Sequence, residues 1–287
     1  MRVSESWKDY ELIDCSDGER LERWGKIILI RPDPQVIWST GKKNPLWRNA
    51  HARYHRSNKG GGSWEMYKKV PDSWSIAFKE LTFNVKPMGF KHTGVFPEQA
   101  VNWEWASEKI KNEKRPINVL NLFGYTGCAT LSCMSAGAEV CHVDASKGMV
   151  NWARENSRSS GIADRPVRWI VDDCVKFVRR EIRRGRRYDG IIMDPPSYGR
   201  GPGGEVWKIE NELNSLLELC LNVFSDDPLF LILNSYTTGL SPAVMEYLLN
   251  VRLKPALGGR VSCDEIGLRV SESGLCLPCG STVIWEK

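Results

Sequence analysis

The chain has 287 residues, of which 41% are hydrophobic and 26% are charged, and its net charge is +5. This composition excludes a disordered or fibrous chain, and the length suits one large domain or a large domain with a small one. The apolar runs are too short for a membrane span and the N-terminus lacks the apolar core of a secretory signal, so we expect a cytoplasmic protein. Nine cysteines, an odd number, predict reduced thiols rather than a disulfide framework.

The first part of the chain, from about residue 10 to residue 86, has the short segments and frequent turns of β-structure. Residues 23–32 (RWGKIILIRP) predict a strand that prolines end, residues 58–63 (NKGGGS) a flexible loop, and residues 73–85 strands joined by a turn. We therefore predict a small antiparallel, β-rich N-terminal domain over residues 1–93.

Near residue 94 the pattern changes to strands that alternate with helices. The predicted strands are residues 117–123, 139–144, 167–171, 188–194 and 229–234. The predicted helices are residues 126–136, 146–161, 175–187 and 206–224, and one that opens at Ser241-Pro242. This alternation predicts an α/β domain with a parallel, Rossmann-like sheet and helices on both faces over residues 94–287. Residues 259–270 and 281–287 predict a C-terminal β-hairpin.

Polar residues and tight turns follow four consecutive predicted strands. In an open α/β sheet, ligands bind beyond the carboxyl ends of the strands. The four ends carry NLFGYTG (residues 121–127), Asp144, the pair Asp172 and Asp173, and Asp194-Pro195-Pro196. A helix N-cap would explain any one of these acids, but acids at successive strand ends predict a binding site.

The glycine turn and the proline corner narrow the choice of ligand. Gly124 and Gly127 bring the backbone close to a ligand, without the G-x-G-x-x-G pattern of dinucleotide-binding folds. Asp144, twenty residues beyond Gly124, suits a ribose diol. Pro195 and Pro196 cannot continue a sheet, so they predict a rigid corner that a dehydrogenase does not need.

Five motifs together resemble one enzyme family. The segments GVFPEQ, NLFGYTG, VDAS, DDC and DPPSYGR, in this order, are similar to those of the class I S-adenosylmethionine-dependent methyltransferases. Within that class the chain looks closest to the bacterial large-subunit ribosomal RNA methyltransferase branch, from about residue 90 to the end. The resemblance implies S-adenosylmethionine as cofactor, no metal, and RNA, above all ribosomal RNA, as partner.

The resemblance also implies site residues. Gly124 and Gly127 would approach the methionine part of the cofactor, and Asp144 would hold its ribose hydroxyls. The adenine would meet Asp173 and the amide of Cys174. The full set implied for the cofactor is Phe96, Gln99, Phe123, Gly124, Tyr125, Thr126, Gly127, Asp144, Ala145, Ser146, Asp173, Cys174 and Asp194. The catalytic residues implied at the floor of the acceptor site are Asp194, Pro195 and Tyr198, with Tyr198 stacking on a flipped base.

The identity of the methylated atom depends on the residues that follow the fourth and fifth predicted strands. Enzymes of this branch that methylate cytosine at carbon need a cysteine after the fifth strand, where this chain has Ser235. A serine without an adjacent base is a poor nucleophile, so nitrogen is favoured as acceptor, with Asp194 taking the proton. Ser197, however, stands where amino-methylating relatives place an aromatic residue.

Several alternatives stay open. The acceptor could be a protein or small molecule, and the chain could be a nucleotide-binding oxidoreductase or a non-catalytic RNA-binding module. The basic stretch 176–187 suits a solvated helix face or a nucleic-acid contact. A second basic region, residues 42–56 with Lys68 and Lys69, contains aromatics that suit base stacking or loop anchoring. Cys276-x-x-Cys279 lacks a second ligand pair for zinc.

Overall fold

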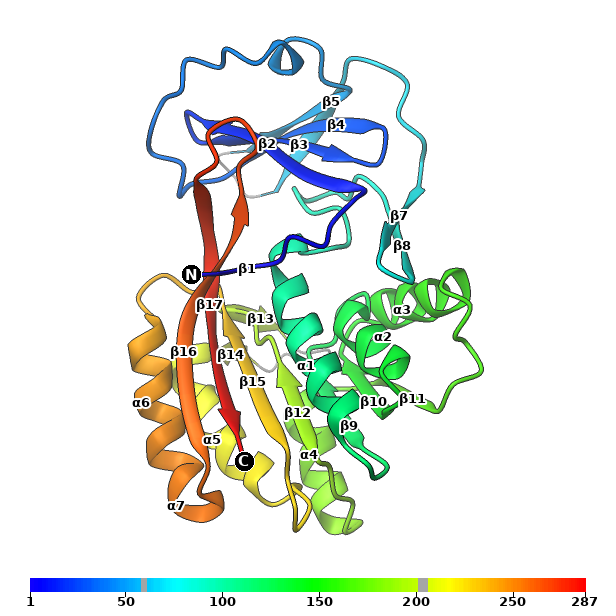
Figure 1. The fold of residues 1–287 in the computed structure, drawn as a ribbon, viewed down its shortest axis with the longest axis vertical. Coiled ribbons are helices and arrows are strands. Elements are labelled where there is room, and N and C mark those ends of the chain that lie inside the picture. Colours follow the sequence, from blue (N-terminus) through cyan, green and yellow to red (C-terminus); the bar gives the residue numbers. More distant parts are fainter. Residues whose placement is uncertain (58–60, 201–205) are drawn as a thin grey trace. The chain divides into compact units, whose positions relative to one another are not determined.

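The computed structural model describes residues 1–57, 61–200 and 206–287, so residues 58–60 of the predicted glycine loop lie outside it. The described chain forms two compact units. The first comprises residues 1–100 and 267–279, and the second residues 101–266 and 280–287 (Figure 1). The domain boundary predicted between residues 93 and 94 stays a prediction.

The first unit is built on a β-sheet in the order β2-β3-β4-β5-β6. Its strands are β2 (Tyr10–Ser16), β3 (Glu19–Trp24), β4 (Ile27–Pro32), β5 (Ala52–Arg56) and β6 (Gly62–Met66). All neighbours are antiparallel except β4 and β5. β7 (Trp74–Phe78) and β8 (Leu81–Val85) form a separate hairpin, and β1 is Arg2–Val3. The prediction of one strand over residues 23–32 is wrong, because Gly25, at φ +62°, turns the chain between β3 and β4.

The second unit is built on a mixed sheet in the order β16-β17-β15-β12-β9-β10-β11. The strands are β9 (Asn118–Leu122), β10 (Glu139–Asp144), β11 (Val167–Val171), β12 (Gly190–Met193), β15 (Phe230–Ser235), β16 (Arg260–Arg269) and β17 (Cys276–Glu286). β9 to β12 and β15 run parallel, and β17 is antiparallel to β15. β16 and β17 form the expected hairpin, whose residues 267–279 belong to the first unit.

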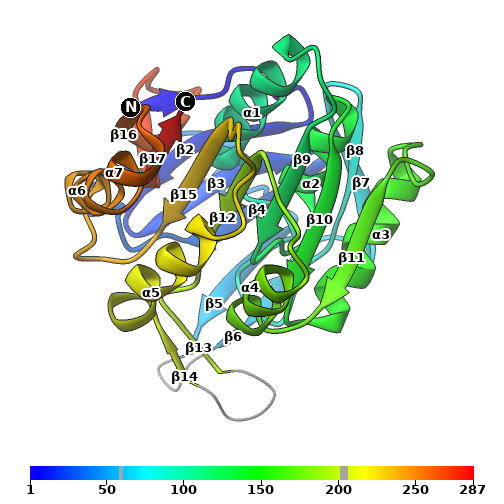
Figure 2. The same cartoon turned by 90° about the horizontal axis from the view of Figure 1, so that it is seen from below.

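Helices cover both faces of this sheet, as the alternating pattern predicts (Figure 2). One layer contains α1 (Ala100–Asn112), α2 (Cys128–Ser135) and α3 (Lys147–Ser159). The other contains α4 (Cys174–Arg183), α5 (Ile209–Leu221) and α6 (Pro242–Arg252), with the short α7 (Lys254–Leu257) after it. Residues 206–208, predicted as the start of a helix, instead form β14 (Val206–Lys208), which pairs with β13 (Tyr198–Arg200).

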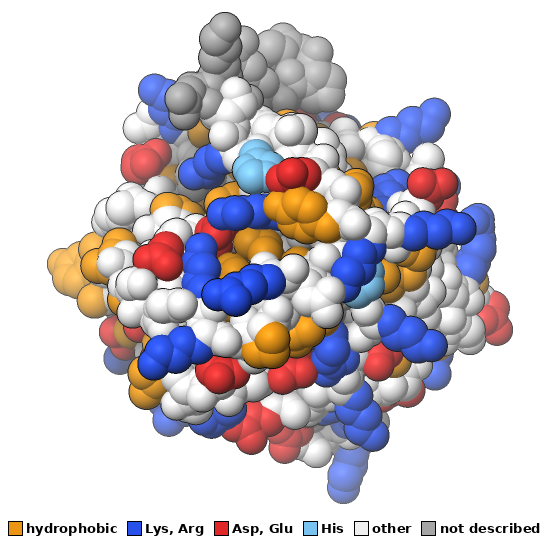
Figure 3. All heavy atoms as spheres, turned by 90° about the horizontal axis from the view of Figure 1, so that it is seen from above, with side chains coloured by type: hydrophobic (Ala, Val, Ile, Leu, Met, Phe, Trp, Pro, Cys, Tyr) orange, Lys and Arg blue, Asp and Glu red, His pale blue; other side chains and the backbone are white. Residues whose placement is uncertain are grey.

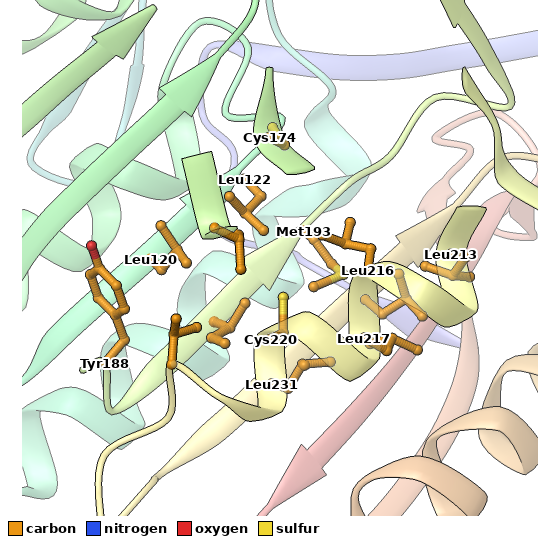
Figure 4. Packing of buried hydrophobic residues seen from close by; sticks show 14 of the residues in the cluster. Leu120, Leu122, Cys174, Tyr188, Met193, Leu213, Leu216, Leu217, Cys220 and Leu231 are labelled. Atoms are coloured by element: carbon orange, nitrogen blue, oxygen red, sulfur yellow. The ribbon is translucent and has the colours of Figure 1, made fainter. Parts of the chain in front are cut away.

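The core of the second unit lies between the sheet and the layer of α4 to α6. Figure 4 shows Leu120, Met193 and Leu231 of the sheet facing Leu216 and Leu217 of α5. These apolar positions on α5 recur at helical spacing, which explains why the helix forms here. All nine cysteines are free thiols, in agreement with the prediction, and most are buried. No helix in the described part of the chain is long and apolar enough to span a membrane.

Leu217→Ala tests this core, because the Leu217 side chain is fully buried. We expect the variant to lose about 2–5 kcal/mol of unfolding free energy through lost burial and the cavity left behind. The matched variant Leu275→Ala removes a leucine that is 71% exposed and should stay within about 0.5 kcal/mol of the wild type. Urea unfolding followed by circular dichroism measures both, and equal midpoints for the two variants would contradict this description of the core.

Candidate active site at the carboxyl ends of the parallel strands

The strand register brings the predicted site residues of the second unit to one edge of the sheet. Leu122, the last residue of β9, lies level with Val143 of β10 and Met193 of β12. The chain leaves these strands at Phe123, Asp144 and Asp194. The strand order also reverses at this point, since β10 and β11 lie on one side of β9 and β12 and β15 on the other. Such a switch point is where open α/β sheets bind ligands.

The turn after β9 has an unusual backbone. Phe123, Tyr125 and Gly127 all adopt left-handed conformations, with φ of +56°, +50° and +85°. For residues other than glycine this costs on the order of 1 kcal/mol or more each, and surrounding contacts must hold it. Here the amide of Phe123 donates to the Cys174 sulfur at 3.4 Å, and the amide of Gly124 donates to the Val143 carbonyl at 2.9 Å.

Asp144 holds the same turn from β10. Its Oδ2 accepts the Tyr125 amide at 2.9 Å and its Oδ1 accepts the Ser146 amide at 2.8 Å. Burial raises the pKa of Asp144, and these two backbone hydrogen bonds act against that rise. Each carboxylate oxygen can accept a further hydrogen bond, so the residue fits a ribose diol. Ala145 and Ser146 are exposed, and the Ser146 hydroxyl caps α3.

Three residues that the sequence did not predict as part of the site pack against the turn or hydrogen-bond to it. A Cβ placed on Gly124 would lie 2.4 Å from Cε1 of the buried His142 ring, and one on Gly127 would lie 2.7 Å from the Ala153 Cβ. The His142 Nδ1 is hydrogen-bonded to the Thr130 hydroxyl at 2.9 Å. The Asn156 amide donates to the carbonyl of Thr126, itself buried, at 2.9 Å. Both glycines are therefore required by close packing, which their positions in the sequence alone do not reveal.

The two acids that follow β11 both have interaction partners within the protein. Asp173 is the N-cap of α4, and its Oδ1 accepts the Lys176 amide at 2.8 Å. Asp172 forms an ion pair with Arg180. The Cys174 side chain is buried, and burial raises the pKa of its thiol well above the usual value. Helix capping, the simpler interpretation of an acid here, therefore applies to Asp173, and a contact to adenine stays a prediction.

Hydrogen bonds hold the Asp194-Pro195-Pro196 corner in place after β12. The Pro196 carbonyl accepts the Trp207 indole N–H at 2.6 Å, and the Ser197 and Thr237 hydroxyls are hydrogen-bonded at 2.6 Å. The Trp207 ring also lies 5.2 Å from that of Phe123, so it connects the corner to the glycine turn. Pro195 is buried, Asp194 is half-buried, and Tyr198 is 52% exposed, at the start of β13.

Phe96 and Gln99 belong to the first unit, not to the unit that carries the strand ends. Phe96 precedes the short 3₁₀ helix η2 (Pro97–Gln99), its ring lies 5.1 Å from that of His92, and Gln99 is buried. A closing role over the cofactor stays a prediction for both. Within the described residues, no group of three or more His, Cys, Asp or Glu side chains could hold a metal ion.

Gly124→Ala tests the close packing of the turn. The new methyl group would overlap the His142 ring, which is buried and hydrogen-bonded, so we expect a loss of about 1–3 kcal/mol of unfolding free energy. Gly148→Ala is the matched control, because its Cβ would have no neighbour nearer than 3.7 Å within α3, and it should be neutral or slightly stabilising. Thermal unfolding compares the two, and a Gly124→Ala variant as stable as the control would show that His142 does not restrict the turn.

Comparison with known proteins identifies the family. A family model described as S-adenosylmethionine-dependent methyltransferase matches residues 40–223, more than half of the chain. The crystal structure of the SAM-dependent methyltransferase from Agrobacterium tumefaciens is 38% identical, with a TM-score of 0.94 over 99% of this chain and 92% of that one. A SAM-dependent methyltransferase structure from Streptococcus mutans shares the fold at 16% identity, with a TM-score of 0.75 over 98% of this chain and 76% of that one.

Curated relatives match over part of their length. The ribosomal RNA large subunit methyltransferase K/L of Cellvibrio japonicus is 28% identical over 62% of this chain and 25% of its own length. The protein of the same name from Shewanella frigidimarina is 29% identical over 47% of this chain and 18% of its own. The chain thus spans a quarter or less of these two relatives. The family match sets aside the oxidoreductase and the non-catalytic RNA-binding module. The chain belongs to the S-adenosylmethionine-dependent methyltransferase family, and S-adenosylmethionine is its methyl donor.

Proposed function

We propose that this enzyme methylates a base of ribosomal RNA, at a nitrogen atom. The observation that carries the proposal is the position of the Asp194-Pro195-Pro196 corner beside the glycine turn, at the switch point of the sheet. The names of the curated relatives support RNA as substrate. A protein or small-molecule acceptor is the outcome to expect if RNA is neither bound nor methylated.

In this proposal the glycine turn and Asp144 bind the methyl donor. The turn around Gly124 and Gly127 would face the methionine part of the donor, and the Asp144 oxygens would accept the ribose hydroxyls. Asp173 and the amide of Cys174 lie at the next strand end, where they would contact adenine. The remaining residues proposed around the cofactor are Phe96, Gln99, Phe123, Tyr125, Thr126, Ala145 and Ser146. The donor supplies an electrophilic methyl group on a sulfonium, so no metal is needed for its transfer.

The corner would provide the acceptor site. Pro195 and Pro196 fix the backbone after β12, so the Asp194 carboxylate can hold the base and accept the proton that nitrogen loses on methylation. Tyr198, half exposed, is available to stack on a base taken out of its strand. Most of the rate gain would come from alignment, which can contribute about 7–11 kcal/mol.

The protonation state of the cysteine thiols supports methylation at a nitrogen atom rather than at a carbon atom. Carbon methylation of a pyrimidine needs a thiolate nucleophile, whereas Ser235 ends β15 and its hydroxyl accepts the Thr237 amide at 3.1 Å. Burial raises the pKa of Cys220 to about 12 and that of Cys263 to about 11, so both thiols are protonated at neutral pH. A protonated thiol is a weak nucleophile. Nitrogen methylation needs no covalent intermediate.

Asp144→Ala tests the binding role. Removal of the charged acceptor should weaken S-adenosylmethionine binding about 10- to 100-fold, the usual effect of losing hydrogen bonds to a charged group. Asp164→Ala removes an exposed carboxylate of the same unit and should leave affinity unchanged. Calorimetric titration measures both, and equal affinities would refute the ribose assignment.

Asp194→Ala tests the transfer role. We expect intact cofactor binding and a loss of about 10²- to 10⁴-fold in methyl transfer to undermethylated ribosomal RNA, the usual contribution of a general base. Ser235→Ala should keep most of its activity, because no covalent step uses the hydroxyl. Labelled cofactor gives the rate, and mass spectrometry of the digested RNA identifies the methylated atom. Full turnover by Asp194→Ala would remove this residue from the mechanism, and a carbon-methylated product would refute the nitrogen assignment.

A further inference from the structure

The first unit contains a cluster of buried and half-buried charges on β3, β4 and the segment that follows β8. Glu22, which is fully buried, accepts two hydrogen bonds from Arg31, at 2.5 and 2.7 Å, and one from the Tyr10 hydroxyl at 2.8 Å. Arg20 pairs with Asp33 at 2.9 Å. These two arginines are therefore neutralised by two carboxylates that are themselves buried, and neither acid remains to neutralise another cation.

A loop formed by residues 86–93 brings a further cation to this cluster. The loop is closed by hydrogen bonds from the Lys86 amide to the Thr93 carbonyl and from the Met88 amide to the His92 carbonyl. The Tyr54 hydroxyl donates to the carbonyl of Gly89 and the Trp64 indole to that of Met88, so strands β5 and β6 anchor the loop. These aromatic rings thus serve as anchors, one of the two interpretations left open by the sequence.

Lys91, in this loop, is half-buried without a carboxylate partner. Within residues 1–57, 61–200 and 206–287, its ammonium donates to the Pro32 carbonyl at 3.3 Å and pairs with no acid. An ammonium has three N–H donors, so two remain for a ligand. Burial, together with the charges of Arg20, Arg31 and Arg56, lowers the pKa of Lys91 to about 8, and Asp33 acts in the opposite direction.

The surroundings of Lys91 are positive. Burial, followed by the charges of Arg31, Lys91, Arg20 and Arg56, lowers the pKa of His92 to about 3, so its imidazole is neutral at pH 7. Arg56, the last residue of β5, is exposed. Asp33 acts on Lys91 and the buried Glu98 acts on Arg20, so carboxylates offset part of this positive charge. A half-buried cation with no acid in contact is further stabilised when an anion binds there.

Buried polar atoms beside the cluster also lack protein partners. In the described structure, the Nε–H of Arg20, the hydroxyl of Thr93 and Oε2 of Glu98 have no hydrogen-bond partner. Thr93 is fully buried and Glu98 is 3% exposed. Buried polar groups in folded proteins are almost always hydrogen-bonded, so water or a ligand completes these. The Arg20 and Thr93 groups are donors, the Glu98 oxygen is an acceptor, and all three atoms are closed to solvent.

We propose that Lys91 binds one backbone phosphate of the RNA substrate. A phosphate oxygen accepts hydrogen bonds only, and lysine binds it as a point charge. The exposed cations Lys43, Arg48, Lys68 and Lys69 belong to the same unit, and Figure 3 shows its Lys and Arg side chains interspersed with Asp and Glu. This inference rests on the proposed function for the identity of the ligand, although the anion site itself does not.

The first experiment tests the anion site without RNA. Inorganic phosphate should raise the unfolding temperature of the wild type above that in chloride at equal ionic strength, since a ligand that binds the folded state stabilises it. Lys91→Gln should lose this rise. Lys91→Arg should keep it, and so should the control Lys26→Gln, which removes an exposed lysine of the same unit. An equal rise in Lys91→Gln and the control, or no rise in the wild type, would overturn the site.

The second experiment tests RNA as the source of the phosphate. The affinity for single-stranded ribosomal RNA fragments, measured by fluorescence anisotropy, should fall with salt, and the slope of log K against log salt should decrease by about 0.7 in Lys91→Gln, the value for one phosphate contact. Lys26→Gln should keep the wild-type slope. An unchanged slope despite a positive first experiment would overturn RNA in favour of free phosphate.

The two proposals fail in different ways. If ribosomal RNA is not methylated but phosphate stabilisation still depends on Lys91, the proposed function fails and the anion site stands. If RNA is methylated and Lys91→Gln shows neither effect, the proposed function stands and this inference fails. Circular dichroism of Lys91→Gln confirms that the variant is folded before either comparison is made.

Discussion

The left-handed backbone of residues 123–127 is the constraint on which the site depends. A turn with two non-glycine residues at positive φ does not persist by itself, so its neighbours must hold it. Asp144, Cys174 and Asn156 each hydrogen-bond to a different backbone group of the turn. They come from β10, α4 and α3, so the turn keeps its shape only when the sheet and both helix layers are assembled.

The same arrangement fixes the separation between the glycine turn and the proline corner, which are the proposed donor and acceptor sides. β9 and β12 are adjacent and in register, so the glycine turn and the proline corner leave the sheet at the same level. Trp207 then links them above the sheet, with its ring against Phe123 and its N–H on the Pro196 carbonyl. Methyl transfer requires in-line alignment over a few ångströms, and in the proposed function two rigid turns on neighbouring parallel strands would provide this without movement of the core.

The sequence predicted the parallel strands and the positions of their ends, because buried strands are continuous apolar runs that stop at a polar or proline residue. It did not predict the contribution of His142, which in EVCHVD is one more residue of a buried strand. Its packing under Gly124 depends on the neighbouring strand. Likewise β14 is too short to show periodicity, and it forms because it pairs with β13. Contacts between segments distant in sequence decided these cases.

The basic helix α4 and Lys91 of the loop 86–93 differ in the partners that the structure gives their cations. On α4 the apolar stripe is packed inward, and Arg180 and Arg184 pair with Asp172 and Glu181. The helix also begins at the site edge with Asp173 as its cap and runs back along the sheet. Its last turn therefore lies roughly 15 Å away, at 1.5 Å per residue. Lys91, by contrast, has no acid partner in the described chain and lies in a closed loop. The lack of an acid in contact with a half-buried cation, rather than the density of basic residues, is therefore what singles out Lys91 as the proposed anion site.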